Sequence, residues 1–275
     1  MAKAAWFSIM TSERTLERNT ETLGVSVVVP CFNEELALHD LHEKLTHARL
    51  VLGSKYETYL LLVDDGSTDA TWSVLQELFA DDPSCTLLRQ SRNFGIAAAI
   101  LAGIRAAKTE IVCSIDCDCT YDPEQLERLI PMLTAEVALV TGSPYHPDGK
   151  VQGSVGWRIF LSKSASALYR AVLRQKLYTY TSCFRVYRRN TILTLDLRRN
   201  GFLGVAELIG KLDLQGSVIV ECPANMGTRV RGVSKMKVAR VIFGHLHLLC
   251  QLLILRGRQA FFGSGAMISA LEPRN

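Results

Sequence analysis

The stretch GVSVVVP, from Gly24 to Pro30, is a run of β-branched residues closed by a proline. A continuous apolar run of this length is typical of a strand that is buried on both faces of a parallel sheet. The next segment, 33–52, carries apolar side chains at helical spacing. A buried strand followed at once by such a helix predicts the first unit of an α/β fold.

The same alternation of strand and helix continues along the chain. Strands are predicted at 59–63, 86–89, 110–115 and 137–141, and helices at about 68–80, at 96–107 and from 122 onward. This rhythm predicts a mainly parallel, Rossmann-like sheet flanked by helices on both faces. Ligands of such folds collect at the carboxyl ends of the strands. Five residues lie there: Pro30, Asp64, Asp65, Asp116 and Asp118.

The pattern changes after Gly142. A loop at 144–156 is predicted to lead into a helix at about 159–173. Two short strands, 184–187 and 217–221, are separated by a helix at about 203–212.

A C-terminal amphipathic helix is predicted at 236–255, and it is unusually apolar. Its apolar core, 241–255, is too short and too polar to be read as a bilayer span. Cationic residues flank this core: Lys235, Lys237, Arg240, Arg256 and Arg258. A helix lying in the plane of a membrane has this composition, but a helix packed on the core or on a partner is equally consistent with its length.

Charge is distributed unevenly along the 275 residues. Residues 1–150 carry 12 Lys and Arg against 22 Asp and Glu, whereas residues 151–275 carry 19 against 5. An acidic half suits cations, and a basic half attracts phosphates, nucleic acid or an anionic membrane. Because the basic half has no recognisable nucleic-acid-reading motif, no nucleic-acid partner is expected.

Cysteine usage and the N-terminus indicate the compartment. The eight cysteines form no CxxC pair, and residues 1–22 contain no apolar stretch of adequate length for a signal peptide. A cytoplasmic protein with reduced thiols is therefore expected. Cys113, Cys117 and Cys119 are a weak candidate for a soft-metal site, because structural zinc sites favour a different spacing with a distant second pair.

Two carboxylates, Asp116 and Asp118, stand just past the strand predicted at 110–115. Alternate residues of an extended segment point the same way, so both can approach one Mg²⁺ or Mn²⁺, cations that prefer oxygen ligands. Such a metal would neutralise charge on a departing diphosphate. The chain has no glycine-rich phosphate loop, so a nucleotide diphosphate would have to be held by metal and cationic side chains.

Several segments, in unbroken order, resemble the successive motifs of family 2 glycosyltransferases with the GT-A fold. They are VSVVVPCFNE (25–34), VDDGSTDAT (63–71), SRNFGIAAAILAG (91–103) and IDCDCTYDPE (115–124). Two later segments, FRVYRR (184–189) and RVRGVSK (229–235), are similar to those of dolichyl- and polyprenyl-phosphate sugar synthases. Together these matches are far more specific than any one motif.

The resemblance implies a role for each matching position. Pro30, Phe32 and Glu34 would line the nucleotide pocket, Asp64 or Asp65 would bind the base or ribose, and Arg92 would approach the nucleotide. Asp116 and Asp118 would hold the metal, with Asp116 also in the nucleotide site. Arg158, Arg185, Arg229, Ser234 and Lys235 would lie near the donor and acceptor phosphates. The catalytic set would be Asp116, Asp118, Arg158 and Arg229.

Some positions depart from the family pattern. Thr120 stands where these synthases often have a glutamine beside the metal, and Pro144 replaces an expected phosphate-binding arginine. Thr179 and Cys183 replace an aspartate and a glycine, and Ile96 replaces a lysine of some bacterial relatives. The donor site is thus expected to be intact and the acceptor site altered, with His146 or Lys150 as candidates to replace the arginine.

These observations predict an inverting, metal-dependent enzyme that transfers a sugar from a GDP- or UDP-sugar to a dolichyl- or undecaprenyl-type phosphate. It would act on the cytoplasmic side, peripherally at the inner, anionic face of a membrane. The expected domains are an N-terminal extension (1–22), a GT-A domain (23–235) and a membrane- or partner-facing helix with a tail (236–275).

Two alternatives remain open. One is a soluble family 2 enzyme that glycosylates a hydroxyl of a saccharide or small molecule, with Glu207 as its base. The other is a non-catalytic scaffold that lost activity through the changes at Pro144 and Thr179.

Overall fold

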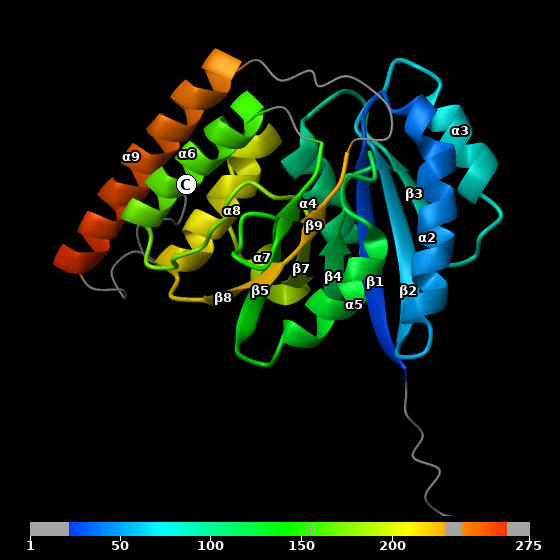
Figure 1. Cartoon of the computed structure of the whole chain (residues 1–275), viewed down its shortest axis with the longest axis horizontal. Coiled ribbons are helices and arrows are strands. Elements are labelled where there is room, and N and C mark those ends of the chain that lie inside the picture. The colour runs from blue at the N-terminus through cyan, green and yellow to red at the C-terminus, as the bar shows by residue number, and fades with distance from the viewer. Residues whose placement is uncertain (1–21, 154–155, 229–237, 263–275) are drawn as a thin grey trace, which may run out of the picture.

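A seven-stranded sheet forms the centre of the molecule (Figure 1). The computed structural model describes residues 22–153, 156–228 and 238–262. The strands of this sheet are β1 (Leu23–Cys31), β2 (Tyr56–Asp64), β3 (Cys85–Arg89), β4 (Ile111–Ser114), β5 (Val137–Ser143), β7 (Arg185–Arg188) and β8 (Val218–Pro223). Their order is β3-β2-β1-β4-β7-β5-β8. Neighbours are parallel except at β7, which is antiparallel to both β4 and β5.

Helices cover both faces of the sheet (Figure 1). One face packs against α2 (Leu38–Leu52), α3 (Thr71–Phe79) and α5 (Leu126–Leu129). The other packs against α4 (Ile96–Ala106), α6 (Gly156–Val172), α8 (Gly201–Leu214) and α9 (Val238–Phe262). Because side chains alternate along a strand, β1 sends Val27 and Val29 into the first core and Val28 into the second. The predicted mainly parallel sheet with helices on both faces is confirmed.

The helix expected from residue 122 onward is divided into short pieces. The Asp122 carboxylate accepts the N–H of Glu124 and caps η3 (Pro123–Gln125), as its type predicts. After α5 comes η4 (Ile130–Met132), whose first turn contains Pro131. Proline has no N–H to donate and clashes with the preceding turn, so a continuous helix is interrupted at this point.

A few short elements were not predicted. β6 (Lys150–Val151) and β9 (Asn225–Met226) pair in parallel, and α7 (Arg189–Leu193) follows β7 directly. β6 lies inside the segment expected to be a loop, and a strand of two residues shows no periodicity in sequence. The short helix η2 (Glu35–Ala37) precedes α2 where one continuous helix was expected.

α6 and α9 pack side by side at the end of the molecule opposite α2 and α3 (Figure 1). The hydroxyl oxygen of Tyr169 in α6 lies 2.8 Å from Nδ1 of His245 in α9, and both residues are buried. Arg256 of α9 also donates to the carbonyl of Val172 at the end of α6. The predicted C-terminal helix is therefore present from Val238 onward and is held to α6 by polar contacts. Among the helices of the described residues, none combines the length and apolarity needed to cross a bilayer.

The buried His245 makes the packing of α9 sensitive to pH. Burial lowers the pKa of this imidazole below its usual 6.5, so the folded protein favours the neutral ring. As pH falls below 6.5, the unfolded chain takes up a proton more readily than the folded chain, and the free energy of unfolding decreases.

We expect urea unfolding to show this loss between about pH 7.5 and about pH 5.5, and His245→Gln to reduce it. His39→Gln, which changes an exposed histidine of α2, should keep the full pH dependence. Equal pH dependence of stability in the His245→Gln variant and the original protein would show that His245 is not its source.

Candidate active site

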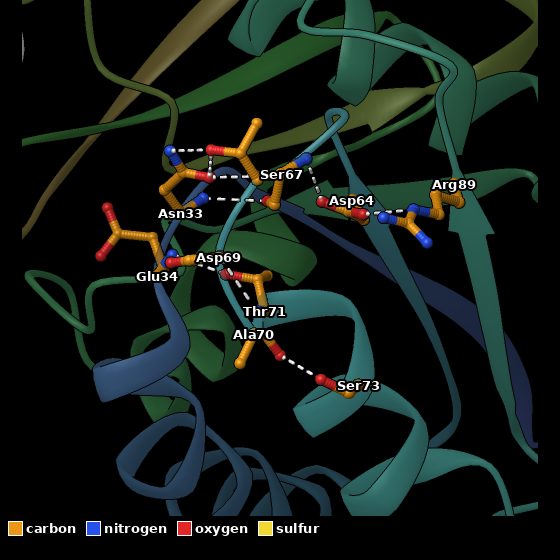
Figure 2. A network of polar contacts seen from close by, with 10 residues as sticks. Asn33, Glu34, Asp64, Ser67, Asp69, Ala70, Thr71, Ser73 and Arg89 are labelled. Atoms are coloured by element: carbon orange, nitrogen blue, oxygen red, sulfur yellow. Dashed lines mark hydrogen bonds and ion pairs between the residues drawn. The ribbon is translucent and has the colours of Figure 1, made fainter.

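The carboxyl ends of β1 and β2 are joined by hydrogen bonds between their loops (Figure 2). The N–H of Asn33 donates to Ser67 Oγ at 2.9 Å, and the N–H of Thr68 donates to Asn33 Oδ1 at 2.8 Å. The N–H of Glu34 donates to Thr71 Oγ1 at 2.8 Å. Asn33 has a φ of 52°, a left-handed value that asparagine tolerates better than most residues. These contacts fix the backbone on which the expected nucleotide residues Pro30, Phe32 and Glu34 stand.

The two adjacent acids after β2 are both buried. Asp64 Oδ1 accepts the N–H of Ser67 at 2.9 Å. Its Oδ2 lies 3.1 Å from Nε of Arg89, which is close enough for an ion pair but not aligned as a hydrogen bond (Figure 2). The Arg89 guanidinium also lies over the ring of Trp72, at 5.2 Å. Asp64 therefore closes the β2 turn and neutralises a cation of β3.

Asp65 holds the loop that carries Arg92. Its Oδ1 accepts the N–H of Phe94 and its Oδ2 the N–H of Gly95, each at 2.8 Å. Burial raises the pKa of Asp65, and the two amide donors act against this because they favour the charged form. Next to it, Gly66 has a φ of 68°, and a Cβ there would lie 2.3 Å from the Arg92 carbonyl carbon. The turn after β2 and the loop after β3 thus meet at a distance that admits only glycine.

Changing Asp65 to asparagine removes one of the two acceptors and places an amide N–H₂ against a backbone N–H. We expect Asp65→Asn to lower the free energy of unfolding by about 1–3 kcal/mol, the usual cost of an unsatisfied buried group. Asp122→Asn is the matched control, because asparagine caps a helix as well as aspartate does. Urea denaturation measures the free energy of unfolding of both variants, and equal values would contradict the role given to Asp65.

The expected metal-binding acids lie just past β4. Asp116 and Asp118 are partly exposed, whereas Cys117 and Cys119 between and after them are buried. Burial therefore alternates along 116–119, but the segment is not extended as predicted, because β4 ends at Ser114, residues 117 and 118 form a turn and Cys119 has a φ of 56°. Thr120, which stands where a glutamine was expected, donates to Asp118 Oδ1 through its N–H (3.0 Å) and through its hydroxyl (2.6 Å). Thr120 thus orients Asp118.

The donor chemistry of this pair fits a hard divalent cation. Carboxylate oxygens suit Mg²⁺ and Mn²⁺, and Mg²⁺ is often held by one or two carboxylates together with substrate phosphates. In the described part of the chain, no cluster of three or more His, Cys, Asp and Glu side chains is arranged to hold a metal. Asp116 and Asp118 would accordingly be the protein ligands, with the remaining positions left to a bound diphosphate and water.

The thiols around the acid pair are buried. A hydrogen bond with Cys31, together with burial, raises the pKa of Cys117, and burial raises the pKa of Cys119 to about 11. Burial, followed by the neighbouring Asp116, raises the pKa of Cys183. Among the described residues no group of three or more His, Cys, Asp and Glu side chains is arranged to hold a metal, so the structure does not support the soft-metal site considered at Cys113, Cys117 and Cys119.

The loop before β7 is anchored by one acid that the sequence did not single out. Glu221 of β8 accepts the N–H groups of Tyr178 (2.9 and 2.8 Å) and Thr179 (2.8 Å). Thr179 Oγ1 lies 2.7 Å from Ser143 Oγ at the end of β5. Two departures from the family pattern, Pro144 and Thr179, are thus at neighbouring positions. The arginine and the aspartate expected from the family pattern are thus both replaced at the corner that Glu221 anchors.

Arg185, expected near the acceptor phosphates, is fully buried at the start of β7. Its guanidinium donates to the carbonyls of Val205 in α8 and Tyr180 in the preceding loop, each at 2.9 Å. These bonds hold the loop at 178–183 against α8. This geometry supports a positioning role for Arg185, and its direct contact with a phosphate stays a prediction.

The other residues expected near the acceptor, and Arg92 of the expected nucleotide site, are placed as follows. Arg158 lies in α6, and Arg229, Ser234 and Lys235 lie outside the described residues. Arg92 is exposed, with its guanidinium 4.9 Å from the ring centre of Phe94. Of the candidates to replace the missing arginine, Lys150 is exposed, and His146 Nδ1 accepts the N–H of Asp148 at 3.2 Å.

Glu207, the base of the alternative hypothesis, is buried in α8. Its Oε2 accepts the N–H groups of Arg198 (2.9 Å) and Arg199 (2.7 Å), and its Oε1 lies 3.4 Å from Nζ of Lys211. Glu207 also lines a cavity of about 700 Å³ between α8, α9 and the loop before α8, away from the acid pair. These contacts give Glu207 the role of anchoring the loop that enters α8.

The chain matches a known family over most of this region. The family model described as glycosyl transferase family 2 covers residues 26–194. The protein belongs to glycosyl transferase family 2 and is a glycosyltransferase.

Two curated relatives are similar to this chain over most of its length. The dolichol-phosphate mannosyltransferase of Pyrococcus furiosus is 30% identical over 86% of this chain and 65% of that protein. The polyprenol monophosphomannose synthase of Mycolicibacterium smegmatis is 30% identical over 78% of this chain and 82% of that protein. The chain therefore spans slightly less than two thirds of the Pyrococcus protein and most of the Mycolicibacterium one.

A solved structure supports the fold. Glucosyl-3-phosphoglycerate synthase from Mycobacterium tuberculosis, in complex with Mn²⁺, UDP and glucosyl-3-phosphoglycerate, matches with a TM-score of 0.61 and 19% identity. The match covers 86% of this chain and 80% of that chain. At this identity the likeness shows the fold alone, which is of the GT-A type.

Proposed function

We propose that the enzyme transfers a sugar from a GDP- or UDP-sugar to a dolichyl- or undecaprenyl-type phosphate, with Mg²⁺ or Mn²⁺ at Asp116 and Asp118. The observation that carries the proposal is the pair of partly exposed carboxylates at the sheet edge, beside loops that are fixed by Asp64 and Asp65. The names of the relatives from Pyrococcus and Mycolicibacterium support a polyprenyl phosphate as the acceptor.

The reaction would be a single displacement with inversion. An acceptor phosphate oxygen forms a bond to the anomeric carbon while the bond from that carbon to the nucleotide diphosphate breaks, and the electron pair leaves with the diphosphate. A bound divalent cation supplies charge neutralisation on that leaving group. Arg158 and Arg229 are proposed to add positive charge where negative charge grows in the transition state.

The resemblance to family 2 glycosyltransferases supports the choice of binding residues. Pro30, Phe32, Glu34, Asp64, Asp65 and Arg92 are proposed to form the nucleotide site. Arg158, Arg185, Arg229, Ser234 and Lys235 are proposed to form the acceptor site. The enzyme would work at the cytoplasmic face of a membrane, with residues 23–235 as the catalytic domain and 236–275 facing the membrane.

The anchoring of Glu207 supports a phosphate acceptor over a hydroxyl acceptor. A hydroxyl must lose a proton as it attacks, so a hydroxyl-directed enzyme needs a base within hydrogen-bond reach. A lipid phosphate is already anionic at neutral pH and needs none. The buried carboxylate of Glu207, held by two backbone N–H groups, is consistent with an enzyme that uses no base.

Removing either acid of the pair should remove the metal. We expect Asp116→Asn and Asp118→Asn each to lower sugar transfer by about 100-fold or more, the scale of losing one electrostatic stabiliser of a transition state. Initial rates with GDP-mannose and UDP-glucose, a prenyl phosphate and Mn²⁺ measure the effect, and paramagnetic resonance measures Mn²⁺ affinity. Asp122→Asn changes an acid four residues after Asp118, and it should keep both the transfer rate and the Mn²⁺ affinity. Unchanged Mn²⁺ affinity in the two variants would refute the metal assignment.

Glu207→Gln separates the two acceptor classes. The glutamine carbonyl can still accept the two backbone N–H groups, so the fold should persist. With a prenyl phosphate as acceptor we expect activity within a few-fold of the original and an unchanged pH profile. A loss of about 10²–10⁴-fold would instead identify Glu207 as a general base and favour a hydroxyl acceptor.

A further inference from the structure

The cavity of about 700 Å³ between α8, α9 and the loop that enters α8 has no part in the proposed reaction. Most of its wall surface is apolar, and the apolar residues are Leu195 of the loop, Leu214 of α8, and Ile254 and Leu255 of α9. Cavities of roughly 300–1,000 Å³ with apolar walls and a few polar groups are the usual form of a small-molecule site. We call this space the α8–α9 cavity.

The α8–α9 cavity does not result from loose packing of the two helices. A Cβ at Gly244 would lie 2.4 Å from a methyl carbon of Leu203, and a Cβ at Gly210 would lie 2.6 Å from one of Leu252. Each glycine therefore lets a leucine of the facing helix pack directly onto its backbone. The cavity lies beside this closely packed contact, and its third wall comes from the segment 194–199.

The two acids of the cavity walls already have partners. Asp196 forms an ion pair with Arg198 at 2.7 Å. Glu207 accepts two backbone N–H groups through Oε2, and its Oε1 lies 3.4 Å from Nζ of Lys211. The sequence of α9 contributes no acid to the remaining wall. The negative charge of the walls is therefore balanced by cations and amide donors that surround it.

Among the described wall residues, one cation has no acidic partner. The Arg199 guanidinium donates to the neutral amide oxygen Oε1 of Gln251 in α9 at 2.8 Å, and no carboxylate of the described residues forms an ion pair with it. A guanidinium presents five N–H donors in a rigid fork that matches the oxygens of an anionic group. An anion at Arg199 would therefore meet a cation that is already held in place beside an apolar wall.

We propose that the α8–α9 cavity is an effector site for a small organic anion with an apolar body. The acid group binds Arg199, and the apolar body lies against Leu214, Ile254 and Leu255. Both parts of the ligand are needed, because an uncharged apolar molecule leaves Arg199 unused and a small inorganic anion gains nothing from the apolar walls.

The wall that carries Arg199 touches the loop of the expected nucleotide site. Gly201 follows two residues later, and a Cβ at Gly95 would lie 2.5 Å from the Gly201 nitrogen. The N–H of Gly95 is in turn held by Asp65, the acid that fixes the loop carrying Arg92. A ligand that ties Arg199 to α8 and α9 would thus restrict the surface on which residues 91–95 rest.

The fluorescence of 8-anilinonaphthalene-1-sulfonate, an aromatic sulfonate, tests the site in the full chain. We expect saturable binding that is displaced by decanoate, but not by acetate or decanol at the same concentration. Arg199→Gln should weaken binding of the probe by about fivefold or more, because it removes a charge-assisted contact. The matched control is Arg258→Gln, which changes an exposed cation of α9 outside the cavity and should bind the probe as the original does.

Two neighbouring residues of α9 separate the cavity from the rest of the helix surface. Ile254 and Leu253 are 57% and 49% exposed, and of these two only Ile254 lines the cavity. We expect Ile254→Asp to lower the affinity for the probe by about tenfold or more, and Leu253→Asp to keep it within about twofold. Thermal unfolding verifies that all variants are folded. Equal affinity of these two variants for the probe would overturn the proposal.

Hydrogen exchange of the full chain tests the effector role. With decanoate at saturation, the backbone amides of 91–95 should exchange about threefold more slowly, while those of α2 on the other face of the sheet should not change. The slowing should be lost in Arg199→Gln at the same concentration of decanoate. Unchanged exchange at 91–95 in the original protein would show that the cavity is not an effector site.

Nucleotide titrations separate this inference from the proposed function, on which its effect on the donor rests. Decanoate should tighten the binding of GDP or UDP with Mn²⁺ by about fivefold, a usual coupling between two sites. If neither nucleotide binds while decanoate still slows exchange at 91–95, the proposed function is rejected and the inference stands. If a nucleotide binds and decanoate alters neither its affinity nor the exchange, the inference is rejected and the proposed function stands. Displacement of the probe by dimer formation would also overturn the inference, because a second copy would then fill the cavity.

Discussion

The parallel pairing of β1 with β2 on one side and β4 on the other is the constraint on which the site depends. The β1–β2 ladder extends to Cys31 opposite Asp64, and Asp65 N–H continues it by donating to the Cys31 carbonyl at 2.8 Å. On the other side the Ile115 N–H donates to the Val28 carbonyl at 3.1 Å. Because all three strands end at the same edge, the segments after them converge on one place. The acids that follow β2 and β4 thus lie at the same edge of the sheet.

The strands and helices of the first half were predictable because each is long enough to show its period. The strand that precedes Asp116 and Asp118 is buried as predicted, whereas the turn at residues 117–118 that follows it was not predicted. The direction of β7 was not predictable, since a strand of four residues gives no sign of which way it pairs. Pro131 was visible in the sequence, and its effect on the helix from 122 onward could have been anticipated.

The anchoring residues could not be found from sequence because their partners are distant or are backbone groups. Asp65 holds residues 29 and 30 positions away, and Glu221 holds residues 42 and 43 positions away. An acid at a strand end resembles a ligand-binding acid in sequence, whichever role it has. Glu207, within α8, likewise resembles a catalytic base in sequence, whereas in the structure its Oε2 accepts two backbone N–H groups. The neighbouring positions of Pro144 and Thr179 also emerge only in three dimensions, where Ser143, next to Pro144, contacts Thr179.

The distribution of thiols has a practical consequence for chemical probes. Seven of the eight cysteines are buried or half-buried, and the pKa of Cys85, the half-buried one, is raised to about 12 by burial. Cys250 alone is exposed, and it lies on α9. Alkylating reagents attack accessible thiolates, so a maleimide dye should label this helix selectively without prior removal of the other cysteines. The native protein thus offers an attachment point from which fluorescence can report the polarity around α9.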